Sequence, residues 1–382
     1  MTRSFILALA CFTAAMYAQQ APEIPFESVP NFLKLPANLY LGEASGVAVN
    51  SKHHVFVFSR GNSTGPAYGA TAAQILEFAP DGTYIREIGH NLYAWSFAHA
   101  IRFDKDDNLW AVDKGSDMII EFDPAGRVKM VFGRKKEASD EGDEPWKRVP
   151  PGGRHLPAVN GQFRQPTDVT WDPAGDIFIS DGYINSRVAK FDKNGDWVKQ
   201  WGEFGSGDGE FNTPHSIASD AQGNIYVADR GNRRIQVFDS GGNFLRAIAI
   251  DIPPPPVVHM WMGTPPAPQP PSTVGAPAAN GTMQPGAPWA VCISPGPTQY
   301  LFAADAYPGR VYKMTLDGKV VGYFGSMGHQ LKQFGWVHEI ACPSENEIYT
   351  AEILNWRVQK LILNPAAHHT SSTRATKTTA TK

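Results

Sequence analysis

An internal repeat constrains this sequence more than any other feature. One copy begins at Pro166 and reads PTDVTWDPAGDIFISDGYINSRVAKFDKNGDWVKQWG; the next begins at Pro214 and reads PHSIASDAQGNIYVADRGNRRIQVFDSGGNFLRAIA. Each copy holds four short runs in which apolar and polar residues alternate, separated by turn motifs such as D-x-x-G-D or D-x-x-G-N. Alternation with a period of two and tight turns are typical of antiparallel β-strands. Each unit is therefore predicted to be a four-stranded antiparallel sheet.

The unit occurs at four further places, which begin at Ser45, His99, Trp289 and His338. Short strands with tight turns that recur at this spacing predict an all-β fold, a six-bladed β-propeller. The last copy shows only three strands. We expect the apolar run Asn31–Leu35 to supply its fourth strand, so that an N-terminal strand closes the ring and removes the exposed edges.

The N-terminus is predicted to direct export. Residues 1–18 are typical of a signal peptide, because Arg3 precedes an apolar run from Phe5 to Met16 and Ala18 is small enough for cleavage before Gln19. We favour export of a soluble protein to the periplasm or the exterior over attachment to a membrane through a lipid on Cys11. No later segment is apolar for long enough to span a membrane.

The remaining chain is divided by two insertions. Residues 19–365 are predicted to form the propeller, with insertions at 133–161 and 251–287, and residues 366–382 are predicted to form a disordered tail. The second insertion is rich in proline, which favours an extended and semi-rigid segment.

The charge balance limits the classes of binding partner, and the positions of the cysteines bear on whether they pair. Lys and Arg total 34 against 37 Asp and Glu, so the basic excess of a nucleic-acid-binding protein is missing. Cys292 and Cys342 differ by one position in the repeat register and should point to opposite faces of their strands, so we expect them to be unpaired. We expect a monomer.

Aligning the copies at the start of the innermost strand reveals the candidate site. Histidine occupies this position in the second, fourth and sixth copies, as His99, His215 and His338. A single histidine at this position is more often a packed or hydrogen-bonded residue than a metal ligand. Three on alternate blades of a six-fold ring, however, converge on the channel axis, which favours a three-histidine metal site with one open position.

A second aligned position lies where the second strand ends, at the same mouth of the channel. It brings Arg60, Lys114, Tyr183 and Arg230 toward the histidines. The arginines suit a substrate carboxylate, and a phenol beside a metal and an arginine can ionise and act as a base. The aspartates that recur here have a structural interpretation instead, as turn caps paired with arginines such as Arg187 and Arg234; they are Asp113, Asp181, Asp229 and Asp305.

The chain resembles the peptidyl-α-hydroxyglycine α-amidating lyases, a zinc-containing branch of the six-bladed NHL-repeat propellers. The resemblance rests on segments such as HAIRFDKDDNLWAVD, SDGYINSRVAKF, FNTPHSIASD and VHEIAC. It implies cleavage of the N–C bond of a peptidyl-α-hydroxyglycine, giving a peptide amide and glyoxylate. His99, His215 and His338 then correspond to the zinc ligands, Arg60 and Tyr183 to the catalytic pair, and Arg230 to a substrate-site arginine.

The resemblance also implies a calcium ion in the channel, held by the backbone carbonyls of Val47 and Ile101 and by Glu339. Two departures stand out. Trp336-Val337 precedes the third histidine where the family has Met-Pro, which places Trp336 with Arg230 and Lys114 among the substrate-binding candidates, and Glu339 replaces an aspartate. The alternative function is a non-catalytic propeller that binds a partner and keeps a structural metal, because this fold hosts many functions.

Overall fold

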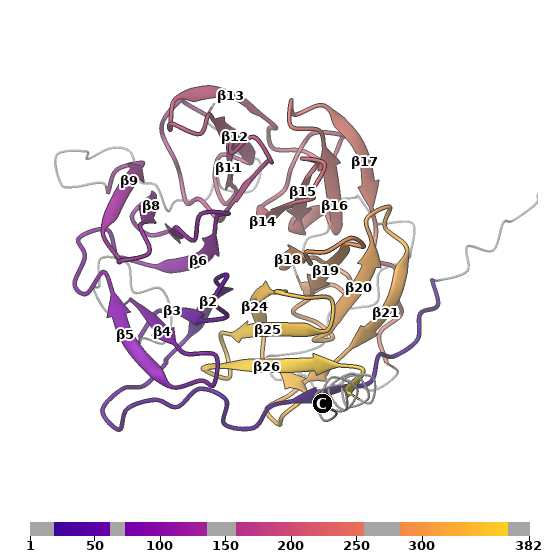
Figure 1. The fold of residues 1–382 in the computed structure, drawn as a ribbon. Helices are drawn as coiled ribbons and strands as arrows, with labels where there is room; N and C mark the ends of the chain where they lie inside the picture. The colour runs from indigo at the N-terminus through magenta and orange to yellow at the C-terminus, as the bar shows by residue number, and fades with distance from the viewer. Residues whose placement is uncertain (1–18, 62–72, 136–157, 256–282, 366–382) are drawn as a thin grey trace, which may run out of the picture.

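A computed structural model describes residues 19–61, 73–135, 158–255 and 283–365. Within these ranges the protein is a six-bladed β-propeller whose sheets stand around a central channel (Figure 1). The predicted signal peptide, the tail 366–382 and the central parts of both insertions lie outside the described residues.

Each blade is a four-stranded antiparallel sheet, with the first strand of the repeat nearest the channel. The first three blades comprise β2 (Ala44–Val49), β3 (Val55–Ser59), β4 (Gln74–Phe78) and β5 (Tyr84–Ile88); β6 (Ala98–Phe103), β7 (Leu109–Asp113), β8 (Met118–Phe122) and β9 (Val128–Phe132); and β10 (Asp168–Trp171), β11 (Ile177–Asp181), β12 (Arg187–Phe191) and β13 (Trp197–Trp201). The fourth and fifth comprise β14 (Pro214–Ser219), β15 (Ile225–Asp229), β16 (Arg234–Phe238) and β17 (Phe244–Ile248), and β18 (Ala290–Ile293), β19 (Tyr300–Ala304), β20 (Val311–Thr315) and β21 (Val320–Phe324).

The sixth blade contains both ends of the described chain. Its strands are β24 (Val337–Ala341), β25 (Glu347–Glu352), β26 (Arg357–Leu363) and β1 (Phe26–Ser28). The predicted closure by an N-terminal strand is confirmed, but the strand is Phe26–Ser28, which pairs with Leu361–Leu363. The run Asn31–Leu35 instead packs against the core shared by the first and sixth blades, with Phe32 buried against Tyr349 of β25. Among the strands of the described residues, only a parallel pair of two-residue strands, β22 (Ser326–Met327) and β23 (Gln333–Phe334), lies outside the six sheets.

The repeated turns have one chemical explanation. Asp172 Oδ1 accepts hydrogen bonds from the backbone N–H groups of Ala174 and Asp176, and Asp220 makes the same pair of contacts in the next blade. Gly175 and Gly223 follow with φ values of 91° and 85°, a conformation that favours glycine. The D-x-x-G motif is therefore a self-capped hairpin turn.

The aspartates at the ends of the second strands are structural, as predicted. Asp181 forms a buried ion pair with Arg187 at 3.0 Å, and Asp229 pairs with Arg234 at 2.8 Å. Asp113 accepts backbone N–H groups of Ser96 and Phe97. The ion pairs join the second and third strands within a blade, and the contacts of Asp113 anchor the second blade to the loop that enters it.

The prediction of unpaired cysteines is wrong, because Cys292 and Cys342 form a disulfide. Both are buried in the layer between the fifth and sixth blades. They do lie on opposite faces of their own sheets, but adjacent blades of a propeller pack face to face. The one-position difference in register therefore turns the two side chains toward each other.

Candidate metal centre

A bulge positions each of the three histidines. The pairing of β6 with β7 shifts register between Ala98 and Ala100, so His99 is not paired with any residue of β7. The same irregularity isolates His215 in β14 and His338 in β24. Bulges re-aim side chains next to functional sites. Here they direct one buried imidazole from each alternate blade into the channel, as the repeat register predicted.

The three imidazoles form a compact cluster. Their ring centroids lie 4.6 to 5.0 Å apart, and one ligand nitrogen from each lies within 4.8 Å of the others. Each Nδ1 lies at hydrogen-bond distance from a backbone oxygen of the following blade: His99 from Thr167 at 2.6 Å, His215 from Trp289 at 2.6 Å and His338 from Ser45 at 2.7 Å. A carbonyl accepts only from a protonated Nδ1, so every Nε2 keeps its lone pair. Such contacts orient metal-ligating histidines.

Electrostatics keep these rings neutral. Burial lowers the pKa of each of the three histidines well below the usual value, and nearby cations lower it further: Lys114 and Arg60 for His99, Arg230 for His215, and Arg60 for His338. Neutral imidazole is the form that binds a metal. Three oriented and unprotonated donors on one axis make this cluster a candidate metal centre.

Tyr183 faces the same nitrogens. Its phenol oxygen lies 3.1 Å from His215 Nε2 and 3.4 Å from His99 Nε2. The Lys114 ammonium lies 3.7 Å from the centroid of the Tyr183 ring, and the Arg230 guanidinium carbon lies 5.5 Å from it. Burial opposes ionisation of the phenol, but the charges of Lys114, Arg230 and Arg60 outweigh it and lower the pKa of Tyr183.

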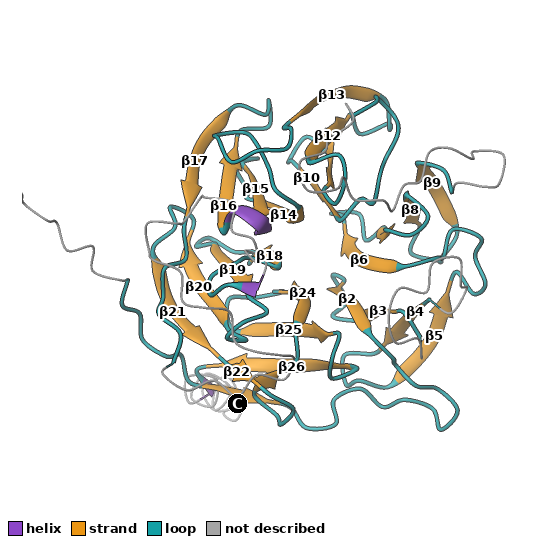
Figure 2. Cartoon of the chain, turned by 180° about the vertical axis from the view of Figure 1, so that it is seen from behind, coloured by secondary structure: helices purple, strands orange, loops and turns teal. Residues whose placement is uncertain are grey.

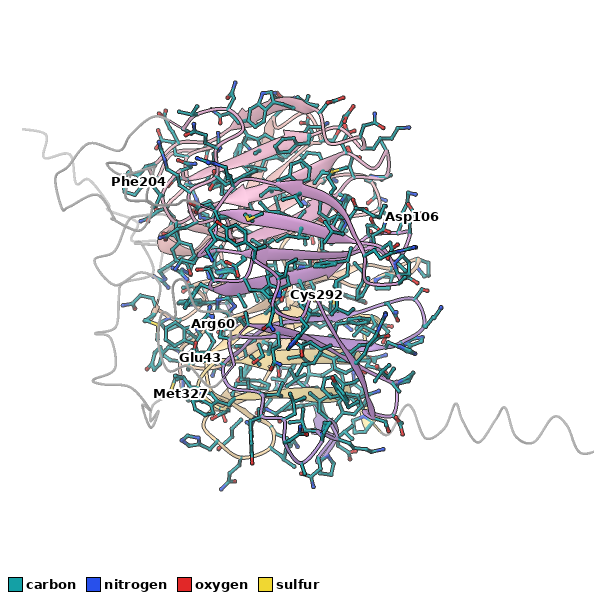
Figure 3. The ribbon with its side chains drawn as sticks, turned by 90° about the vertical axis from the view of Figure 1, so that its left-hand side faces the viewer. Glu43, Arg60, Asp106, Phe204, Cys292 and Met327 are labelled. Atoms are coloured by element: carbon teal, nitrogen blue, oxygen red, sulfur yellow. A yellow bond between two sulfur atoms is a disulfide. The ribbon has the colours of Figure 1, made fainter. Side chains whose placement is uncertain are left out.

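Arg60 is held by a residue that the sequence analysis missed. Its Nη1 donates to Glu43 at 2.9 Å, its Nε donates to the Ala98 carbonyl at 2.9 Å, and its guanidinium lies 3.9 Å from the centroid of Phe97. Figure 3 shows Arg60 and Glu43 toward one face of the ring and Asp106 at the opposite face. Glu43 lies in the loop before β2, outside the aligned repeat, and therefore carried no sequence signal.

Two tryptophans border the centre on the side of the fifth and sixth blades. The Trp289 ring centroid lies 4.9 Å from that of His215, and Trp336 meets Trp289 edge to face at 4.8 Å. Arg230 lies in the short 3-10 helix η2 (Arg230–Asn232), drawn in purple beside β14 in Figure 2. Its guanidinium carbon lies 3.8 Å from the centroid of the Trp289 ring. Trp336 is half-buried and adopts a φ of 61°, and its indole nitrogen has no hydrogen-bond partner among the described residues.

The residues expected to hold calcium do not fit that ion. Val47 and Ile101 donate their backbone N–H groups to Glu339 Oε2, at 2.9 and 3.1 Å. The other oxygen, Oε1, lies 3.2 Å from the Arg102 guanidinium. Burial raises the pKa of Glu339 well above its usual value, although Arg102 opposes that shift. A fixed guanidinium against the required carboxylate disfavours a divalent cation here.

Comparison with known proteins gives the repeat family and the relatives of this chain. The NHL repeat family matches residues 211–238, which include His215. The chain is 30% identical over 237 residues to peptidyl-glycine alpha-amidating monooxygenase A of Xenopus laevis, covering 55% of this chain and 23% of that protein. It is 25% identical over 385 residues to peptidyl-alpha-hydroxyglycine alpha-amidating lyase 1 of Drosophila melanogaster, covering 89% of this chain and 63% of that one. The chain is an NHL-repeat propeller related in sequence to the amidating lyases.

Other similarities are less specific. Human NHL repeat-containing protein 3 is 31% identical over 212 residues, which cover 52% of this chain and 53% of that protein. The structure of virginiamycin B lyase from Staphylococcus aureus aligns with a TM-score of 0.51 over 89% of this chain and all of that one, at 13% identity, which supports the propeller fold alone. The NHL-repeat chain spans about a quarter of the length of the Xenopus monooxygenase.

Proposed function

We propose that this NHL-repeat propeller is an exported, zinc-dependent carbon–nitrogen lyase. Its substrate would be a peptidyl-α-hydroxyglycine or a similar N-acyl compound, and its products an amide and glyoxylate. One observation carries the proposal: the Tyr183 oxygen lies 3.1 Å from His215 Nε2, and three nearby cationic side chains lower the pKa of this phenol. The similarity to the amidating lyase of Drosophila supports the same reaction class.

The donor set suits zinc. Three imidazole nitrogens with one remaining position are the ligand set of catalytic zinc sites. His99, His215 and His338 would hold the ion through Nε2, because each Nδ1 is bound to a backbone carbonyl. A bound zinc ion supplies Lewis acidity that lowers the pKa of the substrate hydroxyl.

Tyr183 is the proposed proton carrier. As a phenolate it takes the proton of the substrate hydroxyl, the carbon–oxygen double bond of glyoxylate forms, and the carbon–nitrogen bond breaks. The electron pair goes to the amide nitrogen, which receives the proton back from Tyr183. No water, oxidant or second substrate is consumed. The positive charges of Lys114, Arg230 and Arg60 favour the phenolate.

The same cations suit the carboxylate of the substrate. Lys114 and Arg230 both lie close to the Tyr183 ring, and we propose that they bind this group. Arg60 is tied to Glu43 and Ala98, so its proposed role is to hold a positive charge in place beside Tyr183. Trp336 and Trp289 would pack against the acyl portion of the substrate.

The test is glyoxylate release from an N-acyl-α-hydroxyglycine. The mature chain, expressed in the periplasm, should contain equimolar zinc and release glyoxylate, and Tyr183→Phe should keep its zinc but lose turnover. His54→Ala is the matched control, because His54 is bound to Glu77 outside the channel. A zinc-loaded wild type that forms no glyoxylate would exclude this reaction.

The second candidate function is a binding module with a structural metal. It is favoured by Trp336, which places a half-exposed indole beside the centre, and by the similarity to human NHL repeat-containing protein 3. This alternative predicts zinc without turnover, and unchanged ligand binding in Tyr183→Phe. Capture of a macromolecular partner would favour the binding module, since the lyase needs only a small carboxylate-bearing substrate.

Export and a monomeric state belong to the proposal as well. No helix among the described residues is long and apolar enough to cross a membrane. N-terminal sequencing of the protein recovered from the periplasm should give Gln19, and light scattering should give the mass of a single chain.

A further inference from the structure

The channel holds a second polar cluster, one layer away from the histidines. Its centre is the guanidinium of Arg102, which is on β6, three residues after His99. We call the Arg102 cluster the set formed by the side chains of Arg102, Asp168, Ser216 and Glu339 together with the backbone oxygens of Val291 and Ile340.

Five of the six blades contribute to this cluster, and the first blade contacts it through Val47. Arg102 pairs with Asp168 through two hydrogen bonds, from Nε to Oδ1 at 3.0 Å and from Nη2 to Oδ2 at 2.6 Å. The same Nη2 also lies 3.2 Å from Ser216 Oγ and 3.1 Å from Val291 O, and Nη1 donates to Ile340 O at 3.1 Å. Glu339 Oε1 lies 3.2 Å from Nε, and Oε2 accepts the N–H of Val47 from the first blade.

The chemistry around the guanidinium is that of a cation site. Six oxygen atoms surround it: two from Asp168, one each from Glu339 and Ser216, and two backbone carbonyls. Calcium is bound in proteins by six to eight oxygens of these same types. Asp168 and Glu339 are almost fully buried, and a buried carboxylate is costly unless a cation is fixed beside it.

We propose that Arg102 takes the place of a divalent cation in the channel, so that closing the ring requires no calcium. The guanidinium also positions the metal centre. Arg102 shares β6 with His99, Ser216 follows His215, and Glu339 follows His338. The cluster therefore fixes the three histidine-bearing strands relative to one another. This inference stands on the channel geometry and does not depend on the proposed reaction.

Calcium content and melting temperature test the inference. The wild type, purified without added calcium, should hold far less than one equivalent of calcium, and neither excess calcium nor EGTA should move its melting temperature. Arg102→Ala removes the cation and leaves its six oxygen neighbours. It should melt about 5 °C or more below the wild type, bind one equivalent of calcium, and recover much of the loss when calcium is added.

Arg86→Ala is the matched control. Arg86 also pairs with a buried carboxylate, Glu77, but at the outer edge of the first blade. The melting temperature of Arg86→Ala should not change when calcium is added. One equivalent of calcium in the wild type, released by EGTA with a fall in melting temperature, would overturn the inference. So would an Arg102→Ala variant that melts like the wild type, or one that is destabilised but does not respond to calcium.

Two further measurements keep the test decisive. If Arg102→Ala does not fold, the wild-type calcium measurement and Arg102→Lys decide the matter, because lysine retains the charge and should fold without calcium. Zinc is counted in the same samples. A wild type that lacks zinc but ignores calcium would remove the proposed lyase and support the role of Arg102.

Discussion

The Nδ1 atom of His215 lies 2.6 Å from the backbone oxygen of Trp289, the residue that occupies the same register position in the next blade. The same relationship links His99 to Thr167 and His338 to Ser45. The odd-numbered blades therefore supply the carbonyls that orient the histidines of the even-numbered blades. Alternation around the ring gives the metal centre both its ligands and their fixed tautomer.

Loss of one histidine should abolish stoichiometric zinc binding. In His215→Ala the ring loses one of three nitrogen donors, and two imidazoles bind zinc far more weakly than three oriented ones. Zinc measured by mass spectrometry should fall well below one equivalent, while circular dichroism should keep the β-sheet signal. A His215→Ala variant that retains a full equivalent of zinc would place the metal elsewhere.

Removing the phenol oxygen should affect turnover and not metal binding. Tyr183→Phe keeps the ring that Lys114 contacts but cannot carry a proton. A general base contributes about 10²- to 10⁴-fold to catalysis, so kcat should fall by about that factor. Zinc content and melting temperature should stay near the wild-type values. Turnover within a factor of about two of wild type would remove Tyr183 from the chemistry.

The pH dependence of activity should depend on Lys114. The phenolate is the reactive form, so activity should rise with pH through the pKa of Tyr183, which Lys114, Arg230 and Arg60 lower. Lys114→Gln removes one of these charges and favours the neutral phenol. The rising limb of kcat/KM, and the tyrosinate absorbance, should therefore move to higher pH.

Lys105→Gln is the control for that shift. Lys105 is exposed in the turn between β6 and β7, away from the histidines. Its profile should overlay that of the wild type. A Lys114→Gln profile that also overlays the wild type would show that this lysine does not set the pKa of Tyr183.

The disulfide should stabilise the fifth and sixth blades against separation. Cys292 and Cys342 enclose a loop of 50 residues, and bridges of this kind contribute about 2–4 kcal/mol. A Cys292→Ser, Cys342→Ser double variant should lose free energy of unfolding of that order in urea titrations. Alkylation of the unfolded mature protein without reductant should detect no free thiol. Two free thiols would contradict the bridge.

The fold could be predicted because the turn residues that define each hairpin act locally and recur in the sequence. The D-x-x-G motifs at Asp172 and Asp220 identify the hairpin turns of their blades from the sequence, without any knowledge of packing. The histidines were predictable for the same reason, since they share one register position. Features that depend on contacts between blades could not be predicted from the sequence. Glu43, the closing strand Phe26–Ser28 and the Cys292–Cys342 bridge are fixed by neighbours distant in sequence.

Arg102 illustrates the same limit most clearly. In sequence it is one arginine in an alternating strand, and alternation says only which face it occupies. Its partners Asp168, Ser216 and Glu339 come from three other blades, so only the closed ring reveals that they surround one guanidinium.

The central claim is that histidines from alternate blades hold a zinc ion beside Tyr183. Anomalous diffraction from crystals of the purified protein, recorded on both sides of the zinc absorption edge, tests it directly. The account predicts one strong peak in the channel, within about 2.0–2.1 Å of Nε2 of His99, His215 and His338, and none in the Arg102 cluster. A channel without a peak at the histidines, in protein that contains zinc, would contradict it.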